Sequence, residues 1–225
     1  MASDGETRRM DPGPTILTWG DAETEAWKAW RLGFAGAGAS DLATLLEVTV
    51  TKKDTPDSLR ARRAELLARK LGKLGPMEES IGMRIGLRLE KLLTEEYARL
   101  RPTHGVELVT GKVVHVHPSG VLAATPDAWT WRLDAPEVRW PVQLKAYSEF
   151  CRAWFKDGAV PVHLQVQVQA EAACAGAPRG SYFVLTGNAE PCFFGDIEAD
   201  REFEALAVAK CREFASEVEA GRKNS

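Results

Sequence analysis

Residues 137–146, EVRWPVQLKA, constrain the fold of this chain more than any other segment. Apolar and polar side chains alternate along it, and a period of two is typical of a β-strand whose faces meet different surroundings. The apolar positions would face a core, whereas Gln143 and Lys145 would share the opposite face, about 6.6–7 Å apart. Pro141 lacks a backbone donor, which indicates an edge position or a bulge there. The segment therefore predicts a sheet with an amide and an ammonium group side by side.

The flanking segments predict a mixed α/β fold. We expect helices over residues 21–31, 57–71, 77–100, 161–175 and 200–220, and strands over residues 106–109, 112–117, 121–125, 181–186 and 192–197. The run GFAGAGAS at residues 33–40 is expected to form a turn that lets backbones approach closely, before a short helix through Leu46. Residues 164–169 alternate like a strand, but their continuation into AEAACA favours a helix.

Length and composition indicate one globular domain. A chain of 225 residues, 44% hydrophobic and 27% charged, can bury a core of ordinary size. We expect a disordered leader over residues 1–18 and a single domain over residues 19–225. No apolar run approaches the ~20 residues that span a bilayer, and no signal peptide is apparent. The cysteines form no CxxC pair, which favours reduced thiols in a cytoplasmic protein over an iron–sulfur cluster.

The net charge of −3 does not indicate nucleic-acid binding, but the charges are unevenly distributed. Residues 52–75 contain eight Lys and Arg against three acids, whereas residues 189–225 contain nine acids against five bases. The basic segment could contact a phosphate backbone while the C-terminal helix faces away from it. Charge alone, however, favours a solvated amphipathic helix for the basic segment.

The sequence contains, close together, the carboxylate, amide and ammonium side chains that suit metal-assisted hydrolysis of a phosphodiester. This reaction uses one or two divalent cations, which prefer oxygen ligands. Asp127 follows Pro126 at the end of a strand, and a hairpin would bring it beside Gln143. One ion could then contact both side chains and the carbonyl of Leu144. Lys145 would orient the attacking water or neutralise charge on the phosphate. Taken alone, PD followed by QxK is a weak motif, because such short strings arise by chance.

Glu90 lies in the helix expected over residues 77–100, beside a stripe at helical spacing that includes Ile81, Ile85 and Leu89. A carboxylate next to an apolar stripe is rarely left without a partner. Glu90 therefore either belongs to the same site or is a half-exposed residue at the edge of the stripe.

Together these motifs resemble the lambda-exonuclease/YqaJ-type viral recombinase family of PD-(D/E)xK nucleases. The resemblance extends over residues 27–176. Its blocks, in order, are WKAWRLG with GAS (Trp27–Gly33 and Gly38–Ser40), IGLRLE (Ile85–Glu90), ATPDAW (Ala124–Trp129), VQLKAY (Val142–Tyr147) and LQVQVQAEAA (Leu164–Ala173). The resemblance implies a restriction-endonuclease-like core, a central mixed sheet flanked by helices.

Site roles can be carried over residue by residue. The resemblance implies that Asp127 ligates the metal ions and that Gln143 fills a position where the family has glutamate. Lys145 would contact the attacking water. Glu90 would help to hold a metal, and Gln167 in the QVQ helix would bond to the reaction centre.

The opening block implies a DNA-binding pair, in which Arg31 and Ser40 hold the terminal 5′-phosphate. The family further implies a Mg²⁺-dependent 5′→3′ exonuclease, with Mn²⁺ able to substitute, that acts on the ends of linear double-stranded DNA in phage or prophage recombination. A ring-shaped homotrimer and a single-strand annealing partner are also implied by the resemblance alone.

Gln143 departs from the family pattern. An amide oxygen can ligate a hard cation but carries no negative charge, so metal binding should weaken. Mrr-like relatives carry QxK and still cut DNA, which favours an active nuclease. Two alternatives remain open: an endonuclease of the same superfamily in defence or repair, and a homologue that binds DNA without cleaving it.

His115 and His117 lie two residues apart on one expected strand, a spacing that zinc sites use. No third ligand is apparent nearby, so we expect both to be surface residues. The sequence contains no GxxxxGK[ST] string, which argues against a built-in ATP motor.

Overall fold

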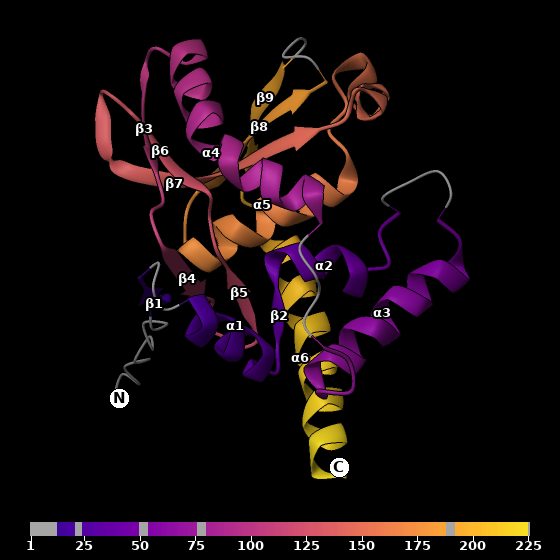
Figure 1. Cartoon of the computed structure of the whole chain (residues 1–225). Coiled ribbons are helices and arrows are strands. Elements are labelled where there is room, and N and C mark those ends of the chain that lie inside the picture. Colours follow the sequence, from indigo (N-terminus) through magenta and orange to yellow (C-terminus); the bar gives the residue numbers. More distant parts are fainter. Residues whose placement is uncertain (1–12, 21–23, 50–53, 76–79, 188–191, 225) are drawn as a thin grey trace, which may run out of the picture.

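Two β-sheets meet one central helix, α5, in the computed structural model of the chain (Figure 1). The structure describes residues 13–20, 24–49, 54–75, 80–187 and 192–224. The strands are β1 (Thr15–Trp19), β2 (Ala37–Gly38), β3 (His104–Leu108), β4 (Lys112–Val116), β5 (Leu122–Ala124), β6 (Ala128–Arg132), β7 (Ala135–Tyr147), β8 (Arg179–Thr186) and β9 (Cys192–Glu198). The helices are α1 (Thr24–Gly33), α2 (Ala39–Leu45), α3 (Pro56–Lys70), α4 (Ile81–Leu100), the 3₁₀ helix η2 (Glu149–Gly158), α5 (Val162–Ala175) and α6 (Arg201–Lys223). The predicted mixed α/β class is confirmed.

The larger sheet has the order β3-β6-β7-β8-β9, and the smaller has the order β1-β4-β5-β2. Strands β7 and β8 are parallel neighbours, so the chain needs a crossover between them, which η2 and α5 provide. The other pairs of the larger sheet are antiparallel. Strand β7 pairs with β6 up to Val142 and with β8 from Val142 onward, so Gln143 and Lys145 lie in the half of β7 that pairs with β8, just beyond the end of the β6 pairing.

Helices α4 and α5 cover opposite faces of the larger sheet. Leu93 of α4 packs on one face with Val142 of β7. Val168 of α5 packs on the other face with Val184 of β8. Because neighbouring residues of a strand point to opposite faces, Gln143 points away from Val142, toward α5. The alternation that predicted β7 thus also places Gln143 and Lys145 on the face of the sheet that α5 covers.

Helix α5 confirms the helical interpretation of the VHLQVQVQAEAACA segment. Its apolar side chains are buried nearly all round, because the helix lies between the two sheets and beside α6. A helix buried on several sides shows no single apolar stripe, which explains why residues 164–169 also resemble a strand. The helix ends at Gly176, whose φ of 63° is the left-handed conformation common at helix ends.

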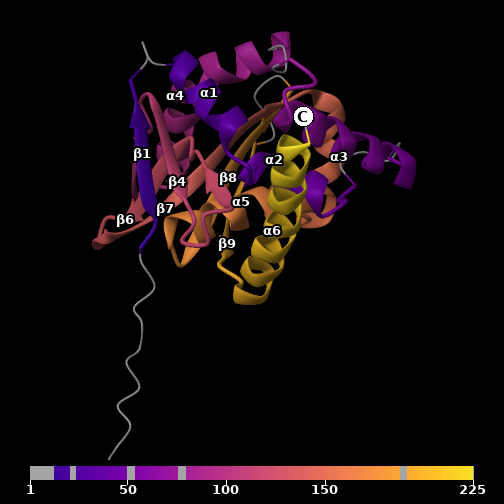
Figure 2. The same cartoon turned by 90° about the horizontal axis from the view of Figure 1, so that it is seen from below.

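The glycine- and alanine-rich turn allows the close backbone approach that its sequence predicts. A Cβ atom on Gly36 would lie 2.0 Å from the carbonyl oxygen of Val121, so only glycine fits there. The contact brings β2 into parallel pairing with β5 and starts α2 directly afterwards. Helix α6 then packs along α2, α3 and α5 (Figure 2).

Several expectations were wrong in detail. Residues 15–18, placed in a disordered leader, belong to β1, which pairs with β4; residues 1–12 lie outside the described part of the chain. Pro141, in contrast, has the edge position that its missing donor indicated. It faces Trp129 of β6 on one side, and on the other side the pairing of β7 with β8 begins only at Val142. Strand β6 was not among the expected strands.

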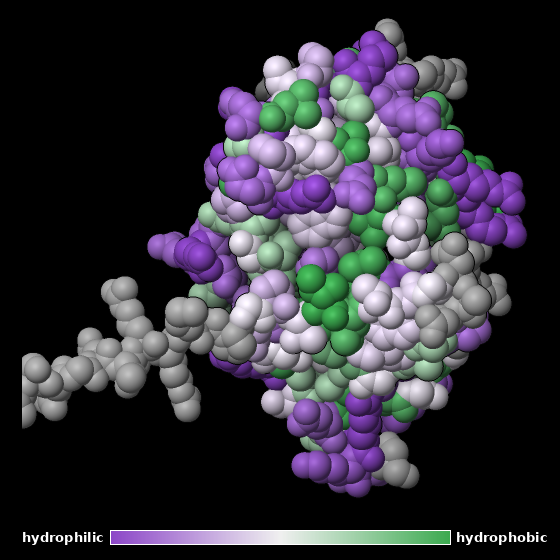
Figure 3. Space-filling view, turned by 90° about the vertical axis from the view of Figure 1, so that its left-hand side faces the viewer, coloured by the Kyte–Doolittle hydropathy of each residue, from purple (hydrophilic) through white to green (hydrophobic). Residues whose placement is uncertain are grey.

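The apolar stripe expected on α4 is buried only in its second half, at Leu93 and Tyr97. Ile81 and Ile85, nearer the start of the helix, are 68% and 51% exposed. The face shown in Figure 3 accordingly has hydrophobic patches among hydrophilic side chains. None of the helices in the described ranges is both long and apolar enough to cross a membrane.

Candidate active site

Asp127 sits immediately before β6, at the point where that strand begins to pair with β7. The pairing places Ala128 opposite Val142, which brings the Asp127 carboxylate against the next residues of β7. The backbone N–H of Leu144 donates to Asp127 Oδ2 at 2.8 Å, and the side-chain amide of Gln143 donates to the same oxygen. The predicted proximity of Asp127 and Gln143 is confirmed.

Gln143 links Asp127 to helix α5. Its side chain is only 1% exposed, and its Oε1 accepts a hydrogen bond from Gln167 Nε2. Its Nε2 also lies 3.4 Å from the carbonyl oxygen of Leu144. The amide therefore donates on one side and accepts on the other, whereas a glutamate there could not donate to Asp127.

Five of the predicted site residues, Arg31, Ser40, Glu90, Asp127 and Gln167, line one pocket of about 200 Å³, whereas Gln143, Leu144 and Lys145 are not among its lining residues. Its charged, amide and serine side chains come from six different parts of the fold: Arg31, Ser40, Glu90, Lys112, Asp127, Gln167 and Glu171. The ammonium of Lys145 is close enough for its charge to lower the pKa values of Glu90, Asp127 and Glu171. The fold thus brings together the motifs that the sequence separates by more than a hundred residues.

The carboxyl groups in this pocket are held in surroundings that oppose their ionisation. Burial, followed by the charge of Asp127, raises the pKa of Glu90 to about 7. Burial also raises the pKa of Asp127, although Lys145 and the Leu144 N–H work in the opposite direction. The same two causes, burial and then Asp127, raise the pKa of Glu171. A bound cation would stabilise these acids as carboxylates.

Arg31 and Ser40 lie together at the edge of the same pocket. The Arg31 guanidinium donates to Ser40 Oγ at 3.2 Å and lies 3.8 Å from the Asp41 carboxylate. Both side chains are exposed, Arg31 from the last turn of α1 and Ser40 from the first turn of α2. A guanidinium and a hydroxyl exposed side by side can bind phosphate oxygens.

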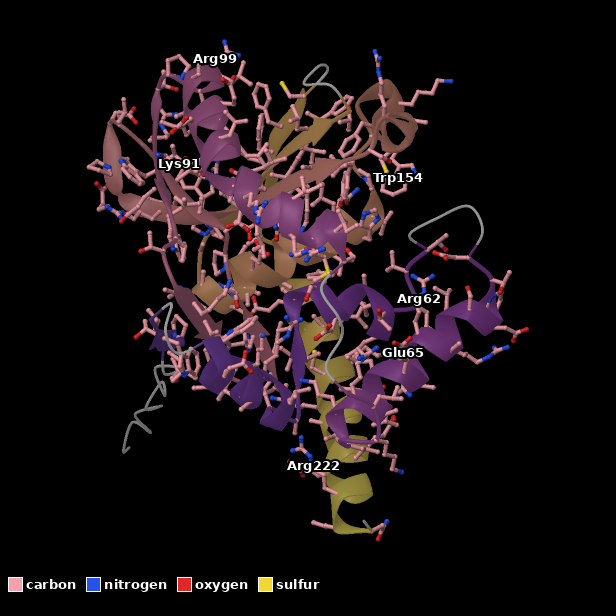
Figure 4. All side chains as sticks on the ribbon, viewed as in Figure 1. Arg62, Glu65, Lys91, Arg99, Trp154 and Arg222 are labelled. Atoms are coloured by element: carbon pink, nitrogen blue, oxygen red, sulfur yellow. The ribbon has the colours of Figure 1, made fainter. Side chains whose placement is uncertain are left out.

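Two cations clamp the end of α1. Lys70, which is 6% exposed, donates from Nζ to the carbonyl oxygens of Arg31 and Phe34, at 2.8 and 2.9 Å. Arg222 of α6 donates to the carbonyl oxygens of Gly33 and Leu32, at 2.9 and 3.0 Å, from its position near this helix end (Figure 4). Carbonyl groups at a helix end have no partner within the helix, so both cations satisfy them and fix the helix that carries Arg31.

The sequence model of a protein family, the YqaJ-like viral recombinase domain, matches residues 26–178. The match covers about two thirds of the chain and includes all the polar residues that line the pocket. The chain belongs to this family. No curated protein matches it in sequence.

Solved structures share the fold of this YqaJ-like domain. An alkaline exonuclease (LHK-Exo) from Laribacter hongkongensis is 21% identical, with a TM-score of 0.62 over 89% of this chain and 95% of that one. The same exonuclease in complex with dAMP aligns with a TM-score of 0.64, at 19% identity over 88% and 95% of the chains. A phage-related exonuclease from Haemophilus somnus 129PT is 11% identical, with a TM-score of 0.56 over 84% and 94%. The predicted family and PD-(D/E)xK fold are confirmed.

The donors of the YqaJ-like domain fit a hard divalent cation in chemical type. The Asp127 carboxylate and the Leu144 carbonyl converge on Nε2 of Gln143 at one strand end, the Gln143 amide oxygen accepts from Gln167, and Asp127 and Glu90 line the same pocket. Mg²⁺ typically takes one or two carboxylates and completes its shell with water. In the described residues, no three Asp, Glu, His or Cys side chains cluster as a metal site. On β7 the side chain beside Asp127 is the amide of Gln143, which is none of these four residue types.

Sequence reasoning missed two residues of this pocket. Glu171 lies in an alanine-rich stretch and looks like part of a core helix, yet it follows Gln167 by four residues and so shares its face of α5. Lys112 begins β4, and its charge lowers the pKa of Glu90 and Asp127. The i,i+4 spacing could have revealed Glu171, whereas no local signal pointed to Lys112.

His115 of β4 and His117, which directly follows this strand, are buried, so the expectation that they are surface residues was wrong. His115 and His117 are 6% and 9% exposed, because β4 is paired on both sides and α5 packs on it. The ring of His115 contacts Trp129, and His117 bonds to Ser119 and to Glu204 at 2.8 and 3.1 Å. Both ring nitrogens of His117 are therefore hydrogen-bonded, whereas His115 Nδ1 is buried without a hydrogen-bond partner among the described residues.

The basic helix α3 carries its arginines mostly in ion pairs. The pairs are Arg60–Asp57, Arg62–Asp54, Arg63–Glu217 and Arg69–Glu65. Lys70 points inward to α1, as described above. The charge pattern of this segment is therefore explained by local pairing and packing, which favours the interpretation as a solvated amphipathic helix.

Proposed function

We propose that this protein is a divalent-metal-dependent DNA exonuclease that hydrolyses linear double-stranded DNA from its 5′ ends in phage or prophage recombination. One observation carries the proposal. A single pocket contains a phosphate-binding pair, Arg31 and Ser40, together with the carboxylates Glu90 and Asp127. An end-binding group and a hydrolytic group in one pocket suit an enzyme that starts from a DNA terminus.

The family and the fold support this proposal. Viral recombinase domains of the YqaJ type are the family to which the chain belongs, and two fold neighbours are described as an alkaline exonuclease and a phage-related exonuclease. A fold does not determine an activity, so the residues of the pocket have to supply the chemistry.

Each residue has a role that follows from its position. Bound Mg²⁺ or Mn²⁺ would polarise the scissile phosphate and lower the pKa of a water molecule. Asp127 and Glu90 would hold the cation, and the Gln143 amide oxygen and the Leu144 carbonyl would add neutral oxygen donors. Lys145 orients the attacking water and offsets negative charge at the phosphate.

The remaining groups position these residues and the DNA. Gln167 fixes the Gln143 amide through its hydrogen bond to Oε1. Arg31 and Ser40 bind the terminal 5′-phosphate and so set which phosphodiester bond reaches the metal. A homotrimeric ring around the DNA and a single-strand annealing partner belong to the same proposal, as does a cytoplasmic location.

A gel assay tests the proposal. The substrates are a linear duplex with a labelled 3′ end and a 5′-phosphate, the same duplex with a 5′-hydroxyl, and closed circular plasmid. We expect degradation of the linear 5′-phosphorylated DNA in Mg²⁺ or Mn²⁺ and none in EDTA. Lys145→Ala should abolish degradation, whereas Lys210→Ala on α6, whose ammonium pairs with Glu213, should leave it intact. Cleavage of the closed circle would instead indicate an endonuclease.

Gln143 motivates a second candidate, a homologue that binds DNA ends without cutting them. Its neutral amide replaces a carboxylate at the metal site, and metal affinity falls with ligand charge. A gel-shift experiment separates the candidates: retention of linear duplex DNA with no cleavage in either metal would favour the binding protein.

A further inference from the structure

Glu171 is the most deeply buried acid in the described part of the pocket. Its side chain is 1% exposed, yet it lines the same cavity as Glu90 and Asp127. Oε1 accepts a hydrogen bond from Gln167 Nε2 at 3.1 Å. Oε2 has no hydrogen-bond partner among the described residues. A buried carboxylate with an unpaired oxygen destabilises the folded state unless a cation or a proton neutralises it.

The position of Glu171 relates it directly to Gln143. Gln167 donates both to Gln143 Oε1 and to Glu171 Oε1, so one amide group bridges the two side chains. The charges of Asp127 and Lys145, which are both assigned to the proposed reaction, act on the pKa of Glu171 in opposite directions. Glu171 is therefore connected through a single side chain, that of Gln167, to Gln143, the position on β7 where the family has a carboxylate.

We propose that Glu171 supplies the negative charge that Gln143 does not bring to the divalent-cation site. The acid has moved from β7 to the facing side of α5, while the total charge around the cation is conserved. This inference rests on the proposed metal-dependent function. It goes beyond it by assigning a role to a residue outside the PD and QxK motifs.

A competing explanation is that Glu171 is a neutral, protonated partner of Gln167 with a purely structural role. The two explanations differ in what an uncharged isostere does. The Glu171→Gln variant would keep a side-chain oxygen that accepts from Gln167, so the structural role predicts little change. The charge-supplying role predicts weaker cation binding, and it predicts that a carboxylate restored on β7 compensates.

The experiment is calorimetric titration of the metal-free full-length chain with Mn²⁺ alone, with the Mn²⁺ electron paramagnetic resonance signal as a second readout. The proteins are the wild type, Glu171→Gln, the double variant Gln143→Glu/Glu171→Gln, and the control Glu204→Gln. Glu204 is a half-buried acid that bonds to His117, away from the pocket lining. Circular dichroism and thermal melting check that each variant is folded.

We expect Glu171→Gln to weaken Mn²⁺ binding about ten- to hundredfold. The double variant should return to within about threefold of the wild type, and Glu204→Gln should bind as the wild type does. Unchanged binding in Glu171→Gln would overturn the inference while leaving the proposed function standing. A loss that the double variant does not recover would also overturn it, because Glu171 would then act otherwise than through its charge. If the wild type itself binds no Mn²⁺, the proposed function fails as well.

Discussion

The ammonium group of Lys70 lies 2.8 Å from the backbone carbonyl oxygen of Arg31, although the two residues are on different helices. The same ammonium group bonds to the carbonyl oxygen of Phe34. Arg31 carries the guanidinium that reaches Ser40 at the pocket. The end of α1 is thus fixed by a buried cation that does not itself line the pocket. The position of the phosphate-binding pair therefore depends on α3 as well as on α1 and α2.

Lys70→Met should destabilise the protein and loosen this helix end. The substitution leaves two buried carbonyl oxygens without their donor, which costs roughly 1–3 kcal/mol of unfolding free energy. Urea unfolding at pH 7 measures the change. Lys73→Met, an exposed position three residues later, should alter stability by less than about 0.5 kcal/mol. Equal effects of the two substitutions would show that the clamp contributes nothing.

The stability contributed at Lys70 should rise with pH. Burial, with help from Arg31 and Arg222 and against the charge of Asp41, lowers the pKa of Lys70 from 10.5 to about 8. Between those values the unfolded chain binds more protons than the folded one, so the free energy of unfolding increases with pH. From pH 7.5 to pH 10 the difference between wild type and Lys70→Met should grow by roughly 1–3 kcal/mol in favour of the wild type. A constant or shrinking difference in urea unfolding would contradict the lowered pKa.

The centre of the site was predictable from the sequence because it depends on local geometry. A strand period of two places Gln143 and Lys145 on one face, and the chain returns after Asp127 over a short antiparallel pair. Only two strands are needed to bring these residues together. The family resemblance added Glu90, Gln167, Arg31 and Ser40, all of which border the pocket or bond to Gln143.

The rest depends on packing between distant segments, which no local pattern encodes. The clamp on α1 joins Lys70 and Arg222 to carbonyl groups that lie far away in the sequence. His115 was expected at the surface. It is buried because both β1 and α5 cover β4, and neither contact is visible in the local sequence. Glu171 is a different case: its i,i+4 spacing from Gln167 is a local signal, but its neighbours in α5 are buried apolar residues typical of a core helix.

Gln143→Glu should make the metal-free protein less stable and should increase the stabilisation that bound metal provides. The substitution replaces a donor to Asp127 by a second carboxylate, and a lost hydrogen bond to a charged group costs about 1.5–3 kcal/mol. In EDTA we expect the melting temperature to fall by roughly 5 °C or more. Saturating Mn²⁺ should then raise it by more than it raises that of the wild type, because the added charge strengthens cation binding.

Differential scanning fluorimetry in EDTA and in Mn²⁺ checks both halves of this expectation. Gln165→Glu is a matched control, since Gln165 bonds to the carbonyl of Val160 and does not line the pocket. An equal Mn²⁺ shift in the wild type and in Gln143→Glu would contradict placement of residue 143 at the cation. A gain in nuclease activity in Gln143→Glu would show that the amide restrains the wild type.

Arg31→Met should remove the preference for 5′-phosphorylated ends without removing hydrolysis. The Arg31 guanidinium is exposed, its Ser40 partner is a neutral hydroxyl, and both groups border the pocket, so a terminal phosphate can take up their free donors. A charge-assisted contact is worth about 1.5–3 kcal/mol, which corresponds to roughly ten- to hundredfold in the ratio of initial rates on 5′-phosphate and 5′-hydroxyl duplexes. Arg60→Met on α3, whose guanidinium pairs with Asp57, should keep the wild-type ratio. An unchanged ratio in Arg31→Met would place the terminal phosphate elsewhere, and loss of activity on both substrates would assign Arg31 to the reaction itself rather than to the DNA end.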